Sequence, residues 1–333
     1  MNRHRAWPAV SVVIGCYNAA PWIRETIDSV LAQTHPVLEV LVVDDGSTDG
    51  TSEIVASYPR GVRFLAEKHR GRPYRNQGIM ASRGDLIAFV DADDLWHAEK
   101  IERQLQALYR TKAEWAICGS QWLHADTGLL TLPPGAPPRE GYILEPLFLG
   151  NFIVASSTVV SRRALESAGY FDESPDVAPV EDWDLWLRIA ADFPVACVPE
   201  PLVTLRLHES SFLAGTPMQV RIASLETVVD RAARREAVRL GPLRKKALFG
   251  VYYAAGVADF RRGRLPAARI WFLRAWRQAP ANLASLAYVS LTYLNAGTTA
   301  ALLRVKRRLS KSKFERSVRK LLGSDRQKTD PTP

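Results

Sequence analysis

"IAFVDADDLW", residues 87–96, runs an apolar segment directly into a turn that carries Asp91, Asp93 and Asp94. A short continuous apolar run is typical of a strand buried on both faces, as in a parallel sheet. Carboxylates crowded on one turn repel one another, and a bound cation relieves that repulsion. The stretch therefore predicts a buried strand with an oxygen-rich site for Mg²⁺ or Mn²⁺ at its end. The alternative is that Asp93 or Asp94 caps a helix starting near residue 98, which accounts for one aspartate and not three.

The sequence on both sides of this stretch alternates between short apolar runs and helical patterns. The runs lie at 10–14, 40–43, 62–65, 86–90 and 116–118, and the helical patterns at 21–32, 49–57, 74–81 and 98–109. This alternation predicts an α/β fold whose central sheet is mainly parallel. Binding sites in such sheets lie at the carboxyl ends of the strands. Tyr17, Asp44, Asp45 and the acidic turn all follow strands, so we expect them at one edge of the sheet.

The second half of the chain changes character. A proline-rich stretch, 131–140, predicts a loop, and the pattern is helical from about residue 218 onward. Gly263 and Gly297 are 34 residues apart, the spacing of tetratricopeptide helix pairs, although an ordinary helical hairpin is equally compatible with the pattern. We predict three parts: an α/β domain over 1–215, a helical region over 216–300 and a basic tail over 301–333.

Positive charge is concentrated at the end of the chain. The net charge is +9, and residues 301–333 hold eleven Lys or Arg against three acidic residues, a net +8. A nucleic-acid enzyme more often spreads basic residues around its cleft, so no nucleic-acid partner is expected. Two short basic amphipathic segments within 301–325 favour attachment to an anionic membrane surface, with a solvated extension as the alternative.

Cysteine usage and hydropathy bear on where the protein works. Cys16, Cys118 and Cys197 lie far apart without metal-ligand spacing, which favours a reducing compartment. The opening residues are read as a first strand and not as a signal peptide. The uncharged stretch 283–303 is rich in Ser, Thr and Asn, which argues against a membrane span. We expect a cytoplasmic protein, peripheral on the inner leaflet if the tail binds membrane.

Three stretches resemble, in order and spacing, the motifs of family 2 glycosyltransferases with the GT-A fold. They are "VSVVIGCYNAAPWIRETIDSVLAQTHPVLEVLVVDDGSTDGT" (10–51), "RNQGIMASRGDLIAFVDADD" (75–94) and "VEDWDLWLRI" (180–189). The resemblance covers about residues 8–210. It implies an inverting enzyme that moves a sugar from a nucleoside-diphosphate sugar to an acceptor hydroxyl in cell-surface polysaccharide or glycolipid assembly. The Gln-X-X-Arg-Trp signature of processive polymerases does not follow Asp182, which disfavours a processive synthase.

On the donor side, the resemblance assigns roles to four residues. Tyr17 lines the nucleotide pocket, Asp45 with Asp44 beside it hydrogen-bonds the base, and Arg75 lies near the diphosphate or the base. Two departures concern the shape of this pocket: Gly15 stands where the family usually has proline, and Tyr74 precedes Arg75 where a small residue is common.

The resemblance also assigns the metal ligands. Asp91 and Asp93 form the Asp-X-Asp pair, with Asp93 the main ligand of Mn²⁺ or Mg²⁺. Asp94 lies close to the donor sugar or the metal. His208 in "RLHESS" corresponds to a histidine that reaches the metal or diphosphate in some members, and a surface role is its alternative.

Asp182 corresponds to the family's catalytic base. Inverting transfer needs a carboxylate that takes the proton of the acceptor hydroxyl, and a helix amino terminus favours the ionised form of such a base. The alternative is a helix-capping acid. Trp183 and Trp186 are candidates either for contact with a saccharide or lipid-linked acceptor or for the core. A non-catalytic transferase fold that recruits partners through its helical region is the competing function.

Overall fold

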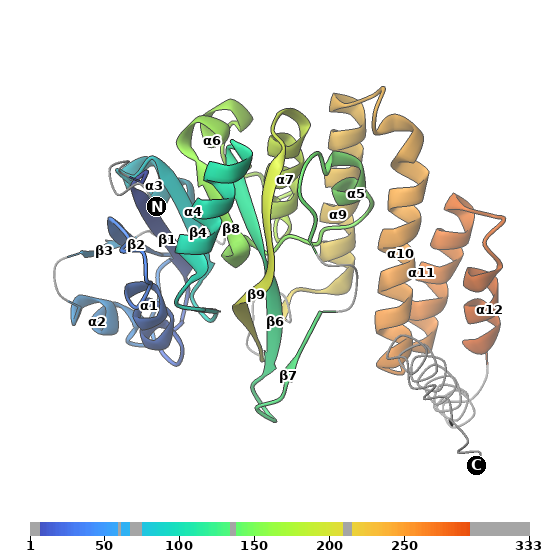
Figure 1. Ribbon diagram of the computed structural model, residues 1–333. Coiled ribbons are helices and arrows are strands. Elements are labelled where there is room, and N and C mark those ends of the chain that lie inside the picture. Colours follow the sequence, from blue (N-terminus) through green and yellow to red (C-terminus); the bar gives the residue numbers. More distant parts are fainter. Residues whose placement is uncertain (1–6, 59–60, 67–74, 134–137, 209–214, 294–333) are drawn as a thin grey trace, which may run out of the picture. The chain divides into compact units, whose positions relative to one another are not determined.

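The computed structural model describes residues 7–58, 61–66, 75–133, 138–208 and 215–293 (Figure 1). The predicted basic tail and Gly297 of the helical repeat lie outside these ranges. Most of the proline-rich stretch lies within them, and only its Thr131 belongs to a strand.

The first half of the sheet is parallel. Its strands are β1 (Val10–Cys16), β2 (Glu39–Asp44), β3 (Val62–Ala66) and β4 (Leu86–Asp91), in the spatial order β3-β2-β1-β4. Chain order runs outward from β1 to β3 and then returns to β4 on the other side of β1, which makes the gap beside β1 a topological switch point. Cys16 pairs with Asp44 and Gly15 with Asp91, so the carboxyl ends of the three strands are level.

The second half of the sheet is mixed. It adds β8 (Thr158–Ser161), β6 (Trp115–His124), β9 (Val195–Leu207) and the two-residue strands β5 (Leu95–Trp96) and β7 (Leu130–Thr131). β8 is antiparallel to β4 and β6, while β9 is parallel to β6 and antiparallel to β5. β6 and β7 are antiparallel because a short turn joins them. The predicted parallel sheet is therefore confirmed for its first half, and the second half is more mixed than predicted.

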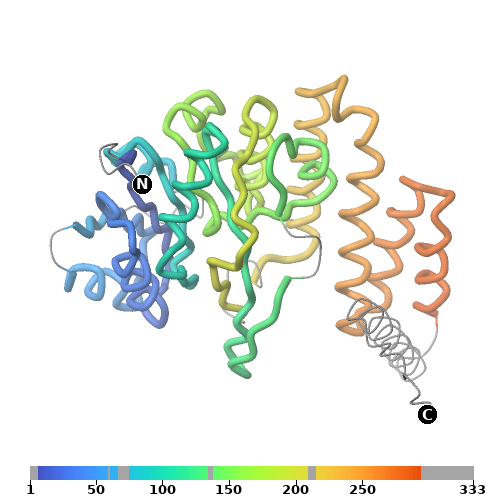
Figure 2. The backbone as a smooth tube through the Cα atoms, in the orientation of Figure 1, coloured from blue at the N-terminus to red at the C-terminus, as the bar shows by residue number. Residues whose placement is uncertain are grey.

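Helices cover both faces of this sheet (Figures 1 and 2). Apolar residues of α1 (Ile23–Leu31), α2 (Thr51–Ala56) and α4 (Lys100–Thr111) share one core with the even-numbered residues of β1 and β2. On the other face, α3 (Arg75–Ala81) packs so closely that a Cβ at Gly78 would lie 2.5 Å from a methyl of Val13. These helices follow their strands where the sequence predicts them.

α7 (Glu181–Asp192) packs against α5 (Leu144–Leu149), α6 (Arg162–Ala168) and α9 (Met218–Arg235). The 3-10 helix η1 (Ala155–Ser157) packs against β4, and the 3-10 helix η2 (Gly241–Leu243) packs against α9. Trp183 and Trp186 of α7 are 2% and 0% exposed, and the Trp186 ring lies 6.1 Å from Phe89 of β4. Both tryptophans belong to the core, so the alternative that they contact an acceptor is wrong.

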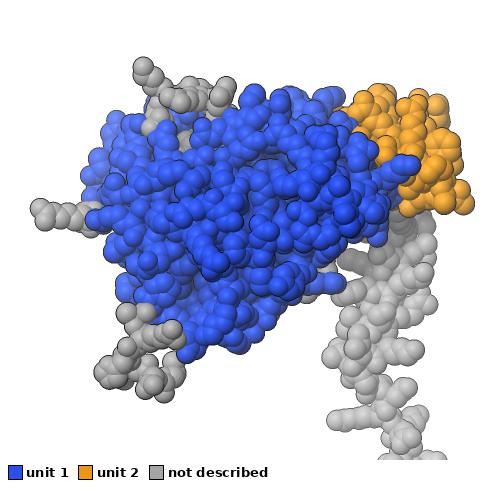
Figure 3. Space-filling view, turned by 90° about the horizontal axis from the view of Figure 1, so that it is seen from above, with its two compact units in different colours: residues 1–251 blue, residues 252–333 orange. Residues whose placement is uncertain are grey.

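The chain divides into two compact units, Met1–Val251 and Tyr252–Pro333 (Figure 3). The division falls within α10 (Arg244–Arg261), and the second unit continues with α11 (Leu265–Gln278) and α12 (Leu283–Leu291). Its core holds Phe260, Ala268 and Phe272, with Tyr288 stacked on Phe272 at 4.7 Å. Gly263 adopts a φ of 75° in the turn between α10 and α11, a left-handed conformation that suits glycine. No helix in the described parts of the chain combines the length and apolar character needed to cross a bilayer.

Candidate functional site

The loops that follow β1 and β2 are tied together beside the switch point. The Asn18 N–H donates to the Ser47 hydroxyl at 2.8 Å, and the Thr48 N–H donates to the Asn18 side-chain oxygen at 2.8 Å. Asn18 has a φ of 49°, a left-handed conformation that asparagine tolerates better than most residues. Tyr17, 46% exposed, precedes this link. The rim of the predicted nucleotide pocket is thereby held in one conformation.

Asp44 ends β2 and Asp45 follows it at the same rim, and both are buried. The Asp44 carboxylate accepts hydrogen bonds from the Ser47 amide at 2.9 Å and the Ser47 hydroxyl, and the Cys16 thiol donates to it at 3.3 Å. The Asp45 N–H donates to the Cys16 carbonyl at 2.9 Å. Asp44 thus holds the loop after β2 in shape.

The acidic turn closes immediately after β4. The Asp94 N–H donates to the Asp91 carbonyl at 3.0 Å. Burial and the neighbouring Asp91 raise the pKa of Asp93, and burial together with Asp91 and Asp93 raises the pKa of Asp94 well above its usual range. The crowding expected from the sequence is therefore present. The capping alternative is wrong, because α4 begins at Lys100 with Glu99 at its N-cap position and no side-chain cap.

His208 reaches this turn from the end of β9. Its Nε2 lies 2.9 Å from Asp93 Oδ2, and its ring centre lies 5.0 Å from that of Trp22, which precedes α1. Arg206, on the same segment as His208, places its guanidinium 5.1 Å from the centre of the Trp22 ring. The surface alternative for His208 is therefore wrong: this histidine contacts the acidic turn.

Arg75, the first residue of α3, links the acidic turn to α7. Its guanidinium lies 2.5 Å from Asp91 Oδ1 and 3.2 Å from Glu181 Oε1. The Arg75 and Glu181 side chains are only 14% and 13% exposed, so this pair is shielded from solvent, whereas the Asp91 side chain is 37% exposed. One cation thereby joins the carboxylate at the end of β4 to the acid beside Asp182.

Asp182 lies in the first turn of α7, which also contains Glu181 and Asp184. Burial and the negative charge of Glu181 raise the pKa of Asp182 to about 7, against the opposing effects of the Trp183 amide and Arg75. The Trp183 N–H donates to Asp182 Oδ1 at 2.7 Å. A carboxyl group with a pKa near neutrality is suited to exchange protons at physiological pH.

The acidic turn offers the kind of ligand atoms that a divalent ion prefers, but not a full set of ligands. Carboxylate oxygens suit Mg²⁺ and Mn²⁺, and a cation would relieve the repulsion that raises the pKa of Asp93. Among the residues that the structure describes, no three His, Cys, Asp or Glu side chains converge to hold a metal by themselves. The donor set therefore fits an ion held by one or two protein groups and completed by substrate oxygens.

Three residues that contact this site were not predicted from the sequence: Glu181 as the partner of Arg75, Trp22 beside His208, and Ser156, whose hydroxyl accepts a hydrogen bond from the Asp91 N–H at 3.0 Å. Glu181 precedes Asp182 in the sequence, so its position beside Asp182 could be predicted, but its pairing with Arg75 could not. Ser156 belongs to "VASSTVV", where hydroxyls inside an apolar run signal that buried polar groups need partners. Trp22 gave no signal, because its contacts come from a strand almost 190 residues away.

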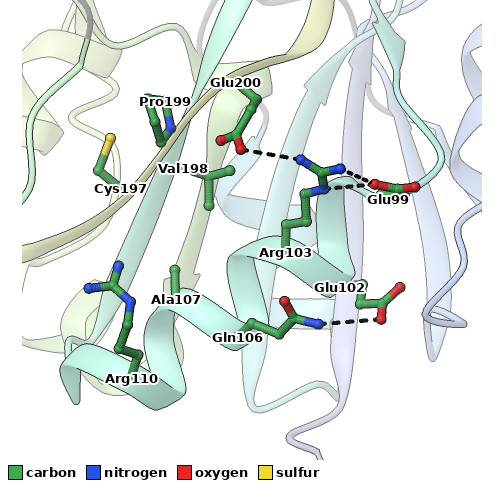
Figure 4. Close-up of a pocket in the computed structure, with 10 residues that line it drawn as sticks. All are labelled: Glu99, Glu102, Arg103, Gln106, Ala107, Arg110, Cys197, Val198, Pro199 and Glu200. Carbon is green, nitrogen blue, oxygen red and sulfur yellow. Dashed lines mark hydrogen bonds and ion pairs between the residues drawn. The ribbon is translucent and has the colours of Figure 1, made fainter.

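A groove of about 670 Å³ lies elsewhere, over α4 and the start of β9 (Figure 4). Its lining includes Arg103, which is paired with Glu99 and Glu200. None of the site residues described above lines this groove.

The chain is similar in sequence to known glycosyltransferases. The model of glycosyl transferase family 2 matches residues 11–167. A Bacillus subtilis glycosyltransferase, TuaG, provisionally assigned to teichuronic acid biosynthesis, is 32% identical over 187 residues, which cover 55% of this chain and 72% of the relative. An uncharacterized glycosyltransferase of Rickettsia typhi is 30% identical over 219 residues, covering 63% and 67% of the two chains.

A solved structure shares the fold. Residues 1–349 of Staphylococcus aureus TarS, in complex with UDP-GlcNAc, superimpose with a TM-score of 0.58 at 16% identity, covering 85% of this chain and 90% of the other. The fold is that of a GT-A glycosyltransferase domain followed by helices. The chain belongs to glycosyltransferase family 2.

Proposed function

We propose that this protein is an inverting, non-processive glycosyltransferase that moves a sugar from a nucleoside-diphosphate sugar to an acceptor hydroxyl, with Asp182 as the base. One observation carries the proposal: Arg75 pairs with Asp91 on one side and Glu181 on the other, so a single guanidinium spans the donor turn and the residue beside the base. A donor at the acidic turn and an acceptor at Asp182 would then be held close enough to react.

The chain's own residues divide the work. Tyr17 and Asp45 border the place for the nucleotide, and Arg75 offers positive charge toward the diphosphate. Asp182 accepts the acceptor proton as the hydroxyl oxygen attacks the anomeric carbon from the face opposite the leaving group. The raised pKa of Asp182 matches this role, because a base with a pKa near the working pH is both ionised and basic enough to take a proton.

Asp93 and His208, with Asp91 beside them, would hold Mn²⁺ or Mg²⁺. Such an ion would supply positive charge to the departing diphosphate. The 2.9 Å contact between Asp93 and His208 supports this pairing of ligands.

Two names among the similar proteins bear on the substrates. TuaG is assigned to teichuronic acid synthesis and TarS was solved with UDP-GlcNAc, which supports a UDP-linked donor and an acceptor in cell-surface polysaccharide or glycolipid assembly.

A saccharide or lipid-linked acceptor at the inner face of the membrane would fit the predicted attachment of residues 301–325. Truncation before Ala301 should then abolish binding to anionic liposomes at low salt and leave donor turnover intact. Liposome binding that survives truncation would contradict the attachment.

Donor turnover tests the proposed function. Purified protein is incubated with a panel of nucleoside-diphosphate sugars with Mn²⁺, Mg²⁺ or EDTA, and released nucleoside diphosphate is measured. We expect metal-dependent turnover of one donor that Asp93→Ala abolishes, with a native circular dichroism spectrum. Full activity in EDTA would exclude the metal, absence of turnover with every donor would argue against catalysis, and proton NMR of fresh product reads the anomeric configuration.

A further inference from the structure

Ser156 joins two parts of the acidic turn through one hydroxyl group. Its side chain is fully buried in η1, and the Asp91 N–H donates to its oxygen at 3.0 Å. The same hydroxyl donates to Asp94 Oδ2. The hydroxyl therefore uses both its acceptor and its donor capacity on the turn that follows β4.

The 3-10 helix η1 that carries Ser156 is itself anchored from the other side. The Trp96 indole N–H donates to the Ser156 carbonyl at 2.9 Å, and the Gln104 amide donates to the Ser157 carbonyl at 2.8 Å. Buried Lys100 donates to the Gln104 side-chain oxygen at 2.8 Å and lies 3.9 Å from the Trp96 ring centre. β5 and α4 thus hold η1 in place, and Ser156 connects that support to the acidic turn.

The electrostatics of the turn make such an anchor necessary. Asp91, Asp93 and Asp94 stand within four residues, and Asp94 is only 2% exposed, so water does little to screen repulsion between their carboxyl groups. A hydrogen bond to a carboxylate is about twice as strong as one between neutral groups, and it fixes the direction of the acceptor oxygen. Without the Ser156 hydroxyl, the Asp91 N–H and the Asp94 carboxyl group would each lose a hydrogen-bond partner.

We propose that Ser156 is a positioning residue of the transfer reaction, which fixes the Asp94 carboxylate and the Asp91 backbone so that the acidic turn is preorganised for the donor diphosphate. This inference rests on the proposed function. Ser156 acts through Asp91 and Asp94 and does not itself need to touch the substrate.

The neighbouring serine provides a matched control. Ser157 is 1% exposed, belongs to the same η1, and donates its hydroxyl to the Val154 carbonyl at 2.8 Å. Ser157→Ala therefore removes a hydroxyl of equal burial and equal size that has no bond to the acidic turn. Any difference between Ser156→Ala and Ser157→Ala reports the contact with the turn.

Hydrogen exchange of the free protein tests the positioning directly. In Ser156→Ala, peptides covering residues 86–97 should exchange roughly tenfold faster than in wild type, because the Asp91 N–H has lost its partner. Ser157→Ala should leave these peptides unchanged. If Ser156→Ala does not fold, Ser156→Cys replaces it, since a thiol occupies the same place and is only a weak donor.

Donor kinetics test the consequence. The kcat/KM for the donor should fall by about tenfold to hundredfold in Ser156→Ala, and Ser156→Thr, which keeps the hydroxyl, should recover most of it. Equal effects of Ser156→Ala and Ser157→Ala on both measurements would overturn the proposal. A further outcome separates the two proposals. If exchange rises only in Ser156→Ala, but the wild-type protein turns over no donor, the anchoring of the turn is upheld and the proposed function is rejected.

Discussion

Asp182 lies where two electrostatic effects oppose each other. The amino terminus of α7 favours its ionised form, whereas burial and the charge of Glu181 disfavour it. Burial and the charge of Glu181 together outweigh the helix amino terminus, since the pKa of Asp182 is raised to about 7. The ion pair between Arg75 and Glu181, which links the donor turn to α7, therefore lies directly beside the base.

Asp182→Asn is expected to abolish transfer while donor binding persists. The amide is nearly isosteric with the carboxyl group and cannot accept the proton, and a general base contributes about 10²–10⁴ to the rate. The measurements are kcat with donor and acceptor and the donor Kd by calorimetry. Asp192→Asn, an exposed aspartate at the other end of α7, is the control. Unchanged turnover in Asp182→Asn would place the base elsewhere.

The pH profile should follow the ionisation of Asp182. Because the base works only when deprotonated, kcat/KM is expected to rise with pH through about 7 and then level off. Removing a neighbouring negative charge makes ionisation easier, so Glu181→Gln should lower the pKa of Asp182 and shift the rise to lower pH. The test is a kcat/KM profile from pH 5 to 9 for both proteins. A shift to higher pH would contradict this assignment of the charges.

Single residues differ in how far their neighbours could be predicted. The acidic turn and Asp182 stand in local motifs, so the sequence could predict a role for each, for Asp182 through the resemblance to family 2 glycosyltransferases. The contact of His208 with Asp93 joins positions 115 residues apart, and that of Arg75 with Glu181 joins positions 106 apart. Such contacts follow from how β9 and α7 return to the sheet, which no local pattern encodes.

At the scale of elements, strands buried on both faces were the easiest to predict. Val10–Cys16 and Glu39–Asp44 are buried throughout, so they appear in the sequence as continuous apolar runs. β9 has exposed residues at its centre, Pro199–Pro201, where its register with β6 shifts. That irregularity breaks the apolar run, which explains why the length and pairing of β9 were not predicted.

Gly78 sets the distance between α3 and the sheet. A Cβ there would lie 2.5 Å from Val13 and 2.9 Å from Val43, so Gly78→Ala should push α3 outward and displace Arg75 with it. We expect a loss of about 1–3 kcal/mol in the free energy of unfolding, the usual cost of overpacking. Activity should also fall more than Met80→Ala lowers it, since Met80 is 59% exposed on the same helix.

Urea unfolding and donor turnover of the two α3 variants are the measurements. Wild-type stability and activity in Gly78→Ala would mean that α3 can move without cost, and that Arg75 is not held by this packing.

At the scale of the whole molecule, the two units have separate cores. The core of the second unit is aromatic: Phe272 stacks on Tyr288 and lies edge-on to Phe260, with centres 4.7 and 6.4 Å away. The core around β1, β2 and α1 contains none of these residues. A compact unit with its own core can lose stability locally.

Phe272→Ala should therefore destabilise the helical unit and spare the catalytic one. Phe272 is fully buried, and its ring approaches Gly256 so closely that a Cβ there would lie 2.7 Å away, so truncation would leave a cavity. The expected cost is about 3–5 kcal/mol. Hydrogen exchange should rise across 252–293 while residues 7–58 and donor turnover stay unchanged, and Ile270→Ala, 56% exposed on the same helix, should change neither. If Phe272→Ala raised exchange in β1 and β2 as well, the two units would unfold as one, and the helical unit would have to be counted among the structures that support the active site.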